Sequence, residues 1–180
     1  MISMYPMATT PQAARAPLAQ SAVDPAVKAA PADHRRIQVR LSDVHGKGVF
    51  ALRPIAAGSR LIEYTGEIIA WDEAMRRHPR DPGQPDHTFY FAIDDGRVID
   101  AAVGGNAARW INHSCAPNCE ADQHGSRVYI DALRDLQPGE ELFFDYGLVV
   151  DERHTPKLKK AYECRCGSAN CRRTMLARKR

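Results

Sequence analysis

The chain has 180 residues, of which 44% are hydrophobic and 26% charged, a composition typical of one globular domain with a single core. No stretch approaches the roughly 18 apolar residues of a membrane-spanning helix, and no basic cluster followed by an apolar run marks a secretory signal. Residues 34–150 hold 13 basic and 17 acidic side chains, a difference of −4, whereas residues 151–180 hold 10 basic and 3 acidic ones, a difference of +7. The acidic part favours a cationic ligand and the basic part a nucleic-acid surface, so charge alone leaves both open.

In chain order, the sequence divides into four segments. Residues 1–33 are rich in Ala and Pro and contain no Gly, which predicts a disordered leader because they can bury little apolar surface. Residues 34–150 form the predicted main domain. Residues 151–160 are polar and indicate a linker, and residues 161–180 form a cysteine-rich segment with a basic tail.

Short apolar or alternating segments separated by turn residues predict a main domain that is mainly β with a few short helices. The helix candidates are Trp71–His78, which has an acidic first turn, and one turn within Asn106–Ile111. Pro79–Asp86 is predicted to be a surface loop. The expected strands are Ile37–Leu41, Val49–Leu52, Arg60–Tyr64, Glu67–Ala70, Phe89–Ile93, Arg97–Ile99, Arg127–Ile130 and Leu142–Asp145.

The cysteines are clustered, and without a secretory signal they favour metal or catalytic chemistry over a disulfide framework. Three thiols lie within Cys164–Cys171, where Gly167 allows a tight turn, and they can converge on one tetrahedral zinc ion. The fourth ligand is then Cys115 or Cys119. A redox or disulfide pair and unligated surface thiols are the alternatives. Three arginines are placed to offset the thiolate charge: Arg165, Arg172 and Arg173.

Three further motifs carry polar or flexible residues. Arg109–Cys119 places Asn, His, Ser and Cys side chains before a proline turn. A hydrogen-bonded turn is favoured over catalysis by a Cys115 nucleophile, because side chains of adjacent residues diverge and rarely form a nucleophile–base pair. Glu140–Gly147 is an aromatic strand end, which by itself is core packing in most proteins. His45–Phe50 holds two glycines that let the backbone approach a ligand, but it lacks the phosphate-binding run of a P-loop.

In their order and spacing, these motifs resemble the SET-domain protein lysine methyltransferases that carry a cysteine-rich post-SET segment. The resemblance covers residues 36–176, and the stretch Gly105–Cys119 is most similar to the trithorax and mixed-lineage-leukaemia type. It implies a SET-domain (β-clip) fold in which the region of Asn112 and His113 forms a pseudoknot. It also implies that S-adenosylmethionine binds on one face and that the target lysine enters a narrow channel from the other.

The resemblance also assigns roles to individual residues. Tyr146 matches the catalytic tyrosine, and Phe144 matches a channel residue that leaves space for di- or trimethylation. The family usually has a tyrosine at the position of Phe89, so either Phe89 or its neighbour Tyr90, a further catalytic candidate, is expected to face the site. The residues that match the cofactor site are His45, Lys47, Gly48, Phe89, Arg109, Asn112, His113 and Arg165. The residues that match the zinc ligands are Cys115, Cys164, Cys166 and Cys171, which leaves Cys119 free.

The implied cofactors are S-adenosylmethionine and zinc, and the implied partner is a lysine-containing, basic protein segment that docks as an added strand. A monomer without membrane contact is expected. Nucleic acid is expected to take part only indirectly, because the basic tail lacks stacking aromatics. The expected location is cytoplasmic or nuclear-type intracellular, with a secreted bacterial effector as the alternative. The alternative function is a catalytically impaired, zinc-stabilised interaction module.

Overall fold

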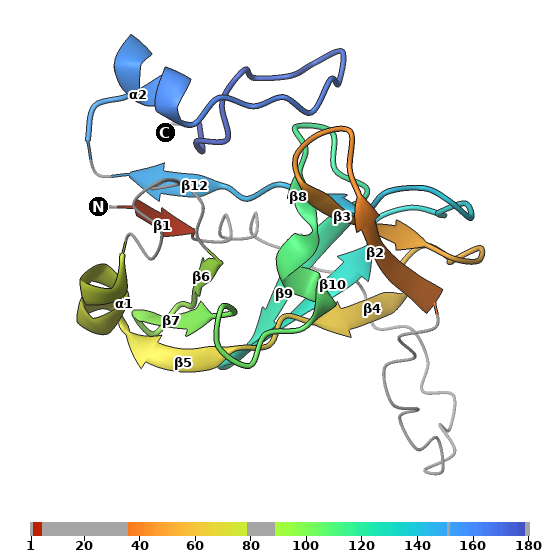
Figure 1. Ribbon diagram of the computed structural model, residues 1–180, viewed down its shortest axis with the longest axis horizontal. Helices are drawn as coiled ribbons and strands as arrows, with labels where there is room; N and C mark the ends of the chain where they lie inside the picture. Colours follow the sequence, from red (N-terminus) through yellow and green to blue (C-terminus); the bar gives the residue numbers. More distant parts are fainter. Residues whose placement is uncertain (1, 5–35, 79–88, 151, 179–180) are drawn as a thin grey trace, which may run out of the picture.

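The computed structural model describes residues 2–4, 36–78, 89–150 and 152–178, and these residues form short strands in five small sheets (Figure 1). Within this part of the chain, no helix is long and apolar enough to cross a membrane. The helices are α1 (Trp71–Arg77) and α2 (Pro156–Ala161), and Ala107–Trp110 forms a 3₁₀ turn. The strands are β1 (Ile2–Met4), β2 (Ile37–Leu41), β3 (Lys47–Ala51), β4 (Arg60–Glu63), β5 (Glu67–Ala70), β6 (Tyr90–Ala92), β7 (Arg97–Asp100), β8 (Asn112–His113), β9 (Cys119–His124), β10 (Arg127–Ala132), β11 (Phe143–Phe144) and β12 (Leu148–Val150).

The prediction of a mainly β domain with a few short helices is confirmed. Every expected strand coincides with or overlaps an observed one, and α1 begins at Trp71 as expected. Strands β8, β9 and β12 were not predicted from the sequence. β9 is polar along most of its length and alternates only over its first four residues, but its backbone pairs with β10 from Cys119 opposite Ala132 to His124 opposite Arg127. Its strand conformation is therefore set by its neighbour.

Two segments that were expected to lack regular structure contain some. Within the leader, β1 pairs with the edge of β12, which corrects the expectation of disorder for those three residues. Within residues 151–160, Pro156 begins α2, and the Thr155 hydroxyl accepts the Leu158 N–H at 3.2 Å. A threonine cap followed by proline is a helix start signal. The rest of the leader and the expected loop Pro79–Asp86 lie outside the described residues.

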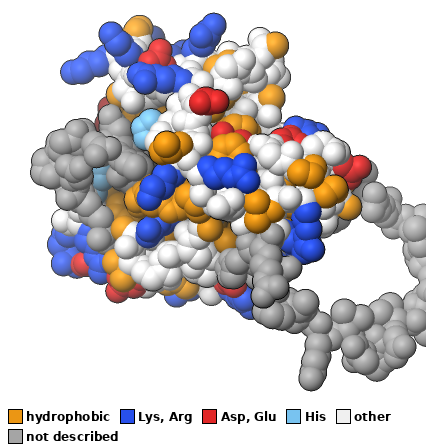
Figure 2. Space-filling model, turned by 45° about the vertical axis from the view of Figure 1, so that its right-hand side comes forward, with side chains coloured by type: hydrophobic (Ala, Val, Ile, Leu, Met, Phe, Trp, Pro, Cys, Tyr) orange, Lys and Arg blue, Asp and Glu red, His pale blue; other side chains and the backbone are white. Residues whose placement is uncertain are grey.

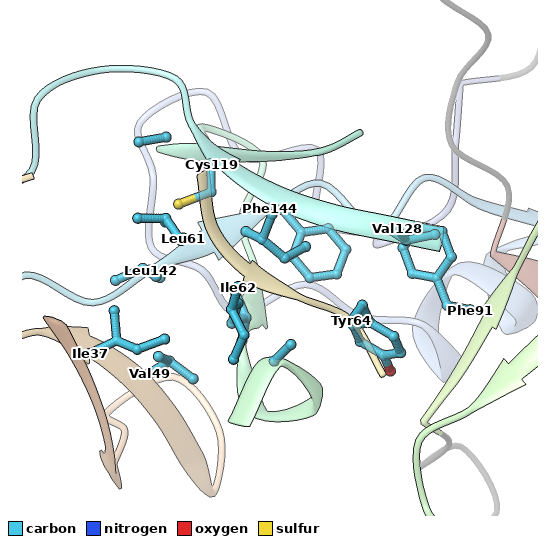
Figure 3. Packing of buried hydrophobic residues seen from close by; sticks show 14 of the residues in the cluster. Ile37, Val49, Leu61, Ile62, Tyr64, Phe91, Cys119, Val128, Leu142 and Phe144 are labelled. Carbon is cyan, nitrogen blue, oxygen red and sulfur yellow. The ribbon is translucent and has the colours of Figure 1, made fainter. Parts of the chain in front are cut away.

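The main core lies between the β2–β3 hairpin, the β4–β10–β9 sheet and β11, and Figure 3 shows side chains from all of them meeting there. Aliphatic residues fill most of this space, with Tyr64, Phe91 and Phe144 at one end. A second buried cluster joins β12 to the C-terminal segment. Its members are Leu148, Val150, Tyr162 and Leu176. Burial of this apolar surface stabilises the attachment of the C-terminal segment to the body.

A short parallel pair, β8 with β11, connects two distant parts of the sequence. Asn112 lies opposite Phe143, and His113 lies opposite Phe144. The turn after β8 is tied to the same strand, because the Asn118 side-chain oxygen accepts the Phe143 N–H at 2.7 Å. This pairing joins the two segments that the expected pseudoknot requires. It also places the Asn-His-Ser-Cys turn beside the aromatic strand end.

Candidate active site and metal centre

Four thiols meet where the turn after β8 contacts the C-terminal segment. The sulfur atoms of Cys115, Cys164, Cys166 and Cys171 all lie within 4.8 Å of one another. Sγ of Cys115 lies 3.7 Å from that of Cys164 and 4.0 Å from that of Cys171. Zinc–sulfur bonds of about 2.3 Å in a tetrahedron separate sulfur atoms by about 3.8 Å, so this donor set fits a structural zinc ion. These separations are too long for disulfides, and all five cysteines are free thiols.

The local hydrogen bonds favour the thiolate form at one of these positions. Burial opposes ionisation of Cys166, but the Cys115 N–H at 3.5 Å and the Ser168 hydroxyl at 3.2 Å outweigh it and lower the pKa of Cys166 to about 5. The thiolate is the metal-binding form. Cys119 contrasts with it: this thiol is fully buried on β9, outside the cluster, and burial raises its pKa to about 12. Cys119 is a neutral core residue.

Arg172 ties the cysteine segment to the strand end that precedes Tyr146. Its backbone N–H lies 3.4 Å from Sγ of Cys115, and its guanidinium binds both carboxylate oxygens of Asp145 at 2.6 and 2.8 Å. Such two-point arginine–carboxylate pairs are geometrically specific. Arg172 was expected to offset the charge of the thiolates, but the main partner of its guanidinium is Asp145. Arg165 is exposed, and its guanidinium lies 3.4 Å from the Glu163 carboxylate.

His113 lies between the thiol cluster and Tyr146. Its Nδ1 accepts the backbone N–H of Tyr146 at 3.1 Å, and its Nε2 lies 3.4 Å from Sγ of Cys115. Burial lowers the pKa of His113 to about 4, and this effect exceeds the opposing attraction of Asp145, whose charge Arg172 neutralises. The imidazole is therefore neutral near pH 7. Because Nδ1 accepts a hydrogen bond, the proton is on Nε2 and faces Cys115.

Four aromatic rings, here called the aromatic group, pack together beside His113: Tyr64, Phe91, Phe144 and Tyr146. The Phe144 and Tyr146 rings are 5.0 Å apart between centroids, and Tyr64 and Phe91 are 5.3 Å apart. The Tyr146 hydroxyl donates to the Ile111 carbonyl at 2.9 Å, and the Tyr64 hydroxyl donates to the Phe89 carbonyl at 3.1 Å. Burial raises the pKa of both tyrosines, so both hydroxyls stay protonated at neutral pH.

Tyr90 does not join the aromatic group. Successive side chains of a strand point to opposite faces, and β6 directs Phe91 toward Phe144 but Tyr90 toward the small cluster around Ile69 and Ala74. The Tyr90 hydroxyl is buried without a hydrogen-bond partner among the described residues. Its position does not support the catalytic role expected for it, whereas the Phe89 ring lies against Trp110 and Arg109.

Asn112 is the centre of a second group, which contains the glycine-rich turn before β3. Its side-chain N–H₂ lies 2.9 Å from the Lys47 carbonyl, 3.3 Å from the His45 carbonyl and 2.9 Å from a carboxylate oxygen of Glu141. The other Glu141 oxygen accepts the Ser42 hydroxyl at 3.0 Å. A Cβ on Gly48 would lie 2.1 Å from the Glu141 carboxylate, so a larger residue would displace the group that binds Asn112 and Ser42.

Cationic and aromatic side chains extend this second group. The Lys47 ammonium lies 4.6 Å from the centre of the Trp110 ring, and the Arg109 guanidinium lies 4.8 Å from it. The Phe89 and Trp110 rings meet edge to face at 5.0 Å. Most of the residues expected at the cofactor site thus lie in one connected region. They are His45, Lys47, Gly48, Phe89, Arg109, Asn112 and His113.

Several residues of this region were not predicted from the sequence. Glu141 binds both Asn112 and Ser42, and it thereby links β8 to the loop before β3. Ser42 and Glu141 are 99 residues apart in the chain. Asp145 was not recognised as the partner of Arg172. The only local signal for Glu141 was its place in the Glu-Glu-Leu run that leads into β11.

The fold and these two groups define the class of protein. Residues 46–147 match the SET domain family, and the chain belongs to this family. It is 39% identical over 136 residues to histone-lysine N-methyltransferase trithorax of Drosophila virilis and 38% identical over 144 residues to histone-lysine N-methyltransferase 2B of Homo sapiens. These matches cover 73% and 76% of this chain but only 3% and 5% of the relatives, so the chain spans a small part of their length.

Solved structures show the same similarity. A polycomb repressive complex 2 in an autoinhibited conformation, bound to S-adenosylmethionine, matches with a TM-score of 0.56 and 36% identity, over 62% of this chain and 15% of that one. The complex from Chaetomium thermophilum matches with a TM-score of 0.57 and 34% identity, over 68% and 16%. The expected resemblance to SET-domain proteins of the trithorax type is confirmed.

Proposed function

We propose that this chain transfers a methyl group from S-adenosylmethionine to a lysine side chain of a protein substrate. The observation that carries the proposal is the position of β8 between the two groups. Asn112 donates to the His45 and Lys47 carbonyls at the start of β3, while His113 accepts the backbone N–H of Tyr146. One two-residue strand therefore fixes the cofactor region relative to the aromatic group, and an in-line displacement needs such alignment.

The residues present fit S-adenosylmethionine, which a similar solved structure contains. The backbone around Gly48 and the Asn112 side chain are proposed to hold its polar end, and Phe89 and Trp110 offer apolar ring surface for its adenine. When bound, S-adenosylmethionine supplies an electrophilic methyl group on a sulfonium. Arg165 is not included, because its exposed guanidinium pairs with Glu163.

The aromatic group is proposed to receive the lysine side chain. Desolvation among aromatic rings disfavours the ammonium form, so the amine reaches the site neutral after losing its proton to solvent. Because the Tyr146 hydroxyl donates to Ile111, its oxygen lone pairs are free to accept an amine N–H. The amine lone pair is then directed elsewhere, toward the methyl group. Tyr146 acts here by orientation and not as a general base, since burial raises its pKa.

The four-thiol cluster is proposed to hold a structural zinc ion. The thiols of the cluster are proposed to act through the structure and to make no contact with the reacting groups. The cluster is proposed to fix the C-terminal segment, and through it two neighbouring residues: His113 accepts the Tyr146 backbone N–H, and Arg172 binds the Asp145 carboxylate.

The direct test is incubation of the full chain with isotope-labelled S-adenosylmethionine and a panel of histones and other lysine-rich proteins, read by mass spectrometry. Label on lysine side chains is the expected result. S-adenosylmethionine binding by calorimetry without transfer to any substrate contradicts the proposal and favours the alternative, an interaction module that retains the fold.

Phe144 is proposed to allow di- or trimethylation, because a phenylalanine in the aromatic group leaves space that a hydroxyl would fill. Phe144→Tyr is expected to shift the product toward monomethyl-lysine without abolishing the first transfer. The measurement is the product distribution at saturation by mass spectrometry. Phe143→Tyr is the matched control, since Phe143 points to the opposite side of β11. A wild-type product that stops at monomethyl-lysine contradicts this role for Phe144.

Glu141 is expected to position Asn112 for cofactor binding. Glu141→Ala removes the only charged acceptor of Asn112 among the described residues, and it also removes the carboxylate that binds Ser42. We expect the dissociation constant of S-adenosylmethionine to rise roughly 10-fold to 100-fold, the scale of a lost charge-assisted hydrogen bond. Calorimetry is the measurement. Glu140→Ala is the control, because Glu140 binds Arg134 and Asn118 instead. Equal affinities for the two variants contradict the positioning role.

The proposed substrate is a basic, lysine-containing protein segment, and the proposed location is a compartment that contains chromatin. Both proposals are supported by the relatives, which are named histone-lysine N-methyltransferases.

We propose a monomer as the active form, because both groups of the site come from one chain. Lys and Arg side chains gather at the top of Figure 2, the end that holds α2 and the C-terminal segment in Figure 1. Nucleic acid contact at that end is proposed to be indirect at most.

A further inference from the structure

The short strand β1 occupies a gap between two other strand edges. Its backbone pairs antiparallel with β12, with Ile2 opposite Val150, Ser3 opposite Val149 and Met4 opposite Leu148. On its other side it lies against β6, the outer strand of the β5–β7–β6 sheet (Figure 1). Without β1, both β12 and β6 would present an open edge toward each other, and open edges accept added strands.

The other edge of β12 is already used by the C-terminal segment. The Leu148 N–H donates to the Met175 carbonyl at 3.3 Å, and the Ala177 N–H donates to the Leu148 carbonyl at 2.8 Å. Successive residues of a strand direct their backbone groups to opposite edges, so the N–H and C=O of Val149 face β1. Ser3 and Val149 are therefore the central pair of this contact.

This gap adjoins the aromatic group. β12 begins two residues after Tyr146, and β6 carries Phe91, whose ring faces Phe144. A peptide strand placed here would bring one of its side chains to the aromatic group. Backbone hydrogen bonds supply affinity in this binding mode, and pockets for alternate side chains supply specificity.

We propose that Ile2–Met4 is an internal competitor that occupies the strand position of the substrate and so holds the chain in a self-blocked state. This inference rests on the proposed lysine methyltransferase function. The segment contains no lysine, and the first lysine of the chain is Lys28, so the docked strand blocks the position without being a substrate there. A substrate segment must displace β1 before its lysine can enter.

A three-residue strand pairs weakly, but here it is tethered. The chain between Met4 and Arg36 can reach well across the domain, and tethered partners act at effective concentrations of about millimolar. The apparent affinity for substrate falls by the fraction of molecules in which the position is open. A substrate that pairs more strongly than β1 shifts this equilibrium toward the open state, so the block is reversible.

Ser3→Pro tests this inference in the full chain, because proline removes the N–H that faces Val149 and cannot continue the pairing. Ser21→Pro is the matched control, since it adds proline to the leader outside β1. We expect amide exchange of Val149 to become roughly 3-fold to 10-fold faster in Ser3→Pro only. We also expect KM for a lysine peptide to fall by the same factor at unchanged kcat. A synthetic peptide of residues 1–10, added to Ser3→Pro, should inhibit competitively with the substrate.

Unchanged Val149 exchange, or a KM that stays equal or rises in Ser3→Pro, overturns the inference. Failure of the proposed function gives a different result: neither chain then transfers methyl groups to any peptide. In that case, binding of a fluorescent lysine peptide in the presence of S-adenosylhomocysteine decides the question. Tighter binding to Ser3→Pro than to Ser21→Pro supports the internal block, and equal binding overturns it.

Discussion

Tyr146→Phe is expected to lower kcat at least roughly 100-fold while the fold and the affinity for S-adenosylmethionine stay close to those of the wild-type chain. The substitution keeps the ring in contact with Phe144 and His113 and removes only the hydroxyl. Loss of one hydrogen bond aimed at the reacting group costs about two to three orders of magnitude in rate. Loss of its bond to the Ile111 carbonyl costs about 1 kcal/mol of stability, which a folded domain tolerates.

The measurement is single-turnover methyl transfer at saturating cofactor and peptide, together with calorimetry for cofactor binding. Tyr129→Phe is the matched control, because Tyr129 lies on β10 against Arg60 and Arg127, apart from the aromatic group. Transfer in Tyr146→Phe within a few-fold of the wild-type rate contradicts the assignment. Tyr64 is then the remaining phenol of the aromatic group.

Removal of one cluster thiol is expected to abolish zinc binding and to release the C-terminal segment. Structural zinc sites contribute about 10–16 kcal/mol of apparent binding free energy, so a three-ligand site is far weaker. In Cys166→Ala we expect the metal content, measured by mass spectrometry of the purified protein, to fall from about one zinc ion per chain to nearly zero. Amide exchange of Arg172 and Leu176 should rise strongly, and methyl transfer should be lost.

The loss of transfer follows from the contacts that join the two sites. His113 links Cys115 to the backbone of Tyr146, and Arg172 holds Asp145. A free C-terminal segment also exposes the edge of β12 that Met175 and Ala177 cover. Cys119→Ala is the control, since this thiol lies in the core and should leave the metal content unchanged. One zinc ion per chain in Cys166→Ala sinks the structural assignment of the cluster.

The sequence by itself determined the features that depend on neighbouring residues. Alternation of apolar residues located strands such as Ile37–Leu41, and the acidic first turn located α1, because these patterns act within one element. The three closely spaced cysteines predicted a metal site for the same reason. The motifs in their order were also enough to indicate the SET domain, since the family's residues lie in short conspicuous runs.

Tertiary structure decided everything that depends on contacts between distant residues. Local spacing left Cys115 and Cys119 as equal candidates for the fourth ligand, and the fold brings Cys115 to the cluster and buries Cys119 in the core. Pairing with β7 directs Phe91, and not Tyr90, to the aromatic group. β1 and β9 are stabilised as strands because another strand offers them its edge, and the alternation in their own residues is too short to predict a strand. The backbone pairing and burial of a strand depend on the element it packs against, so the local sequence alone does not predict them.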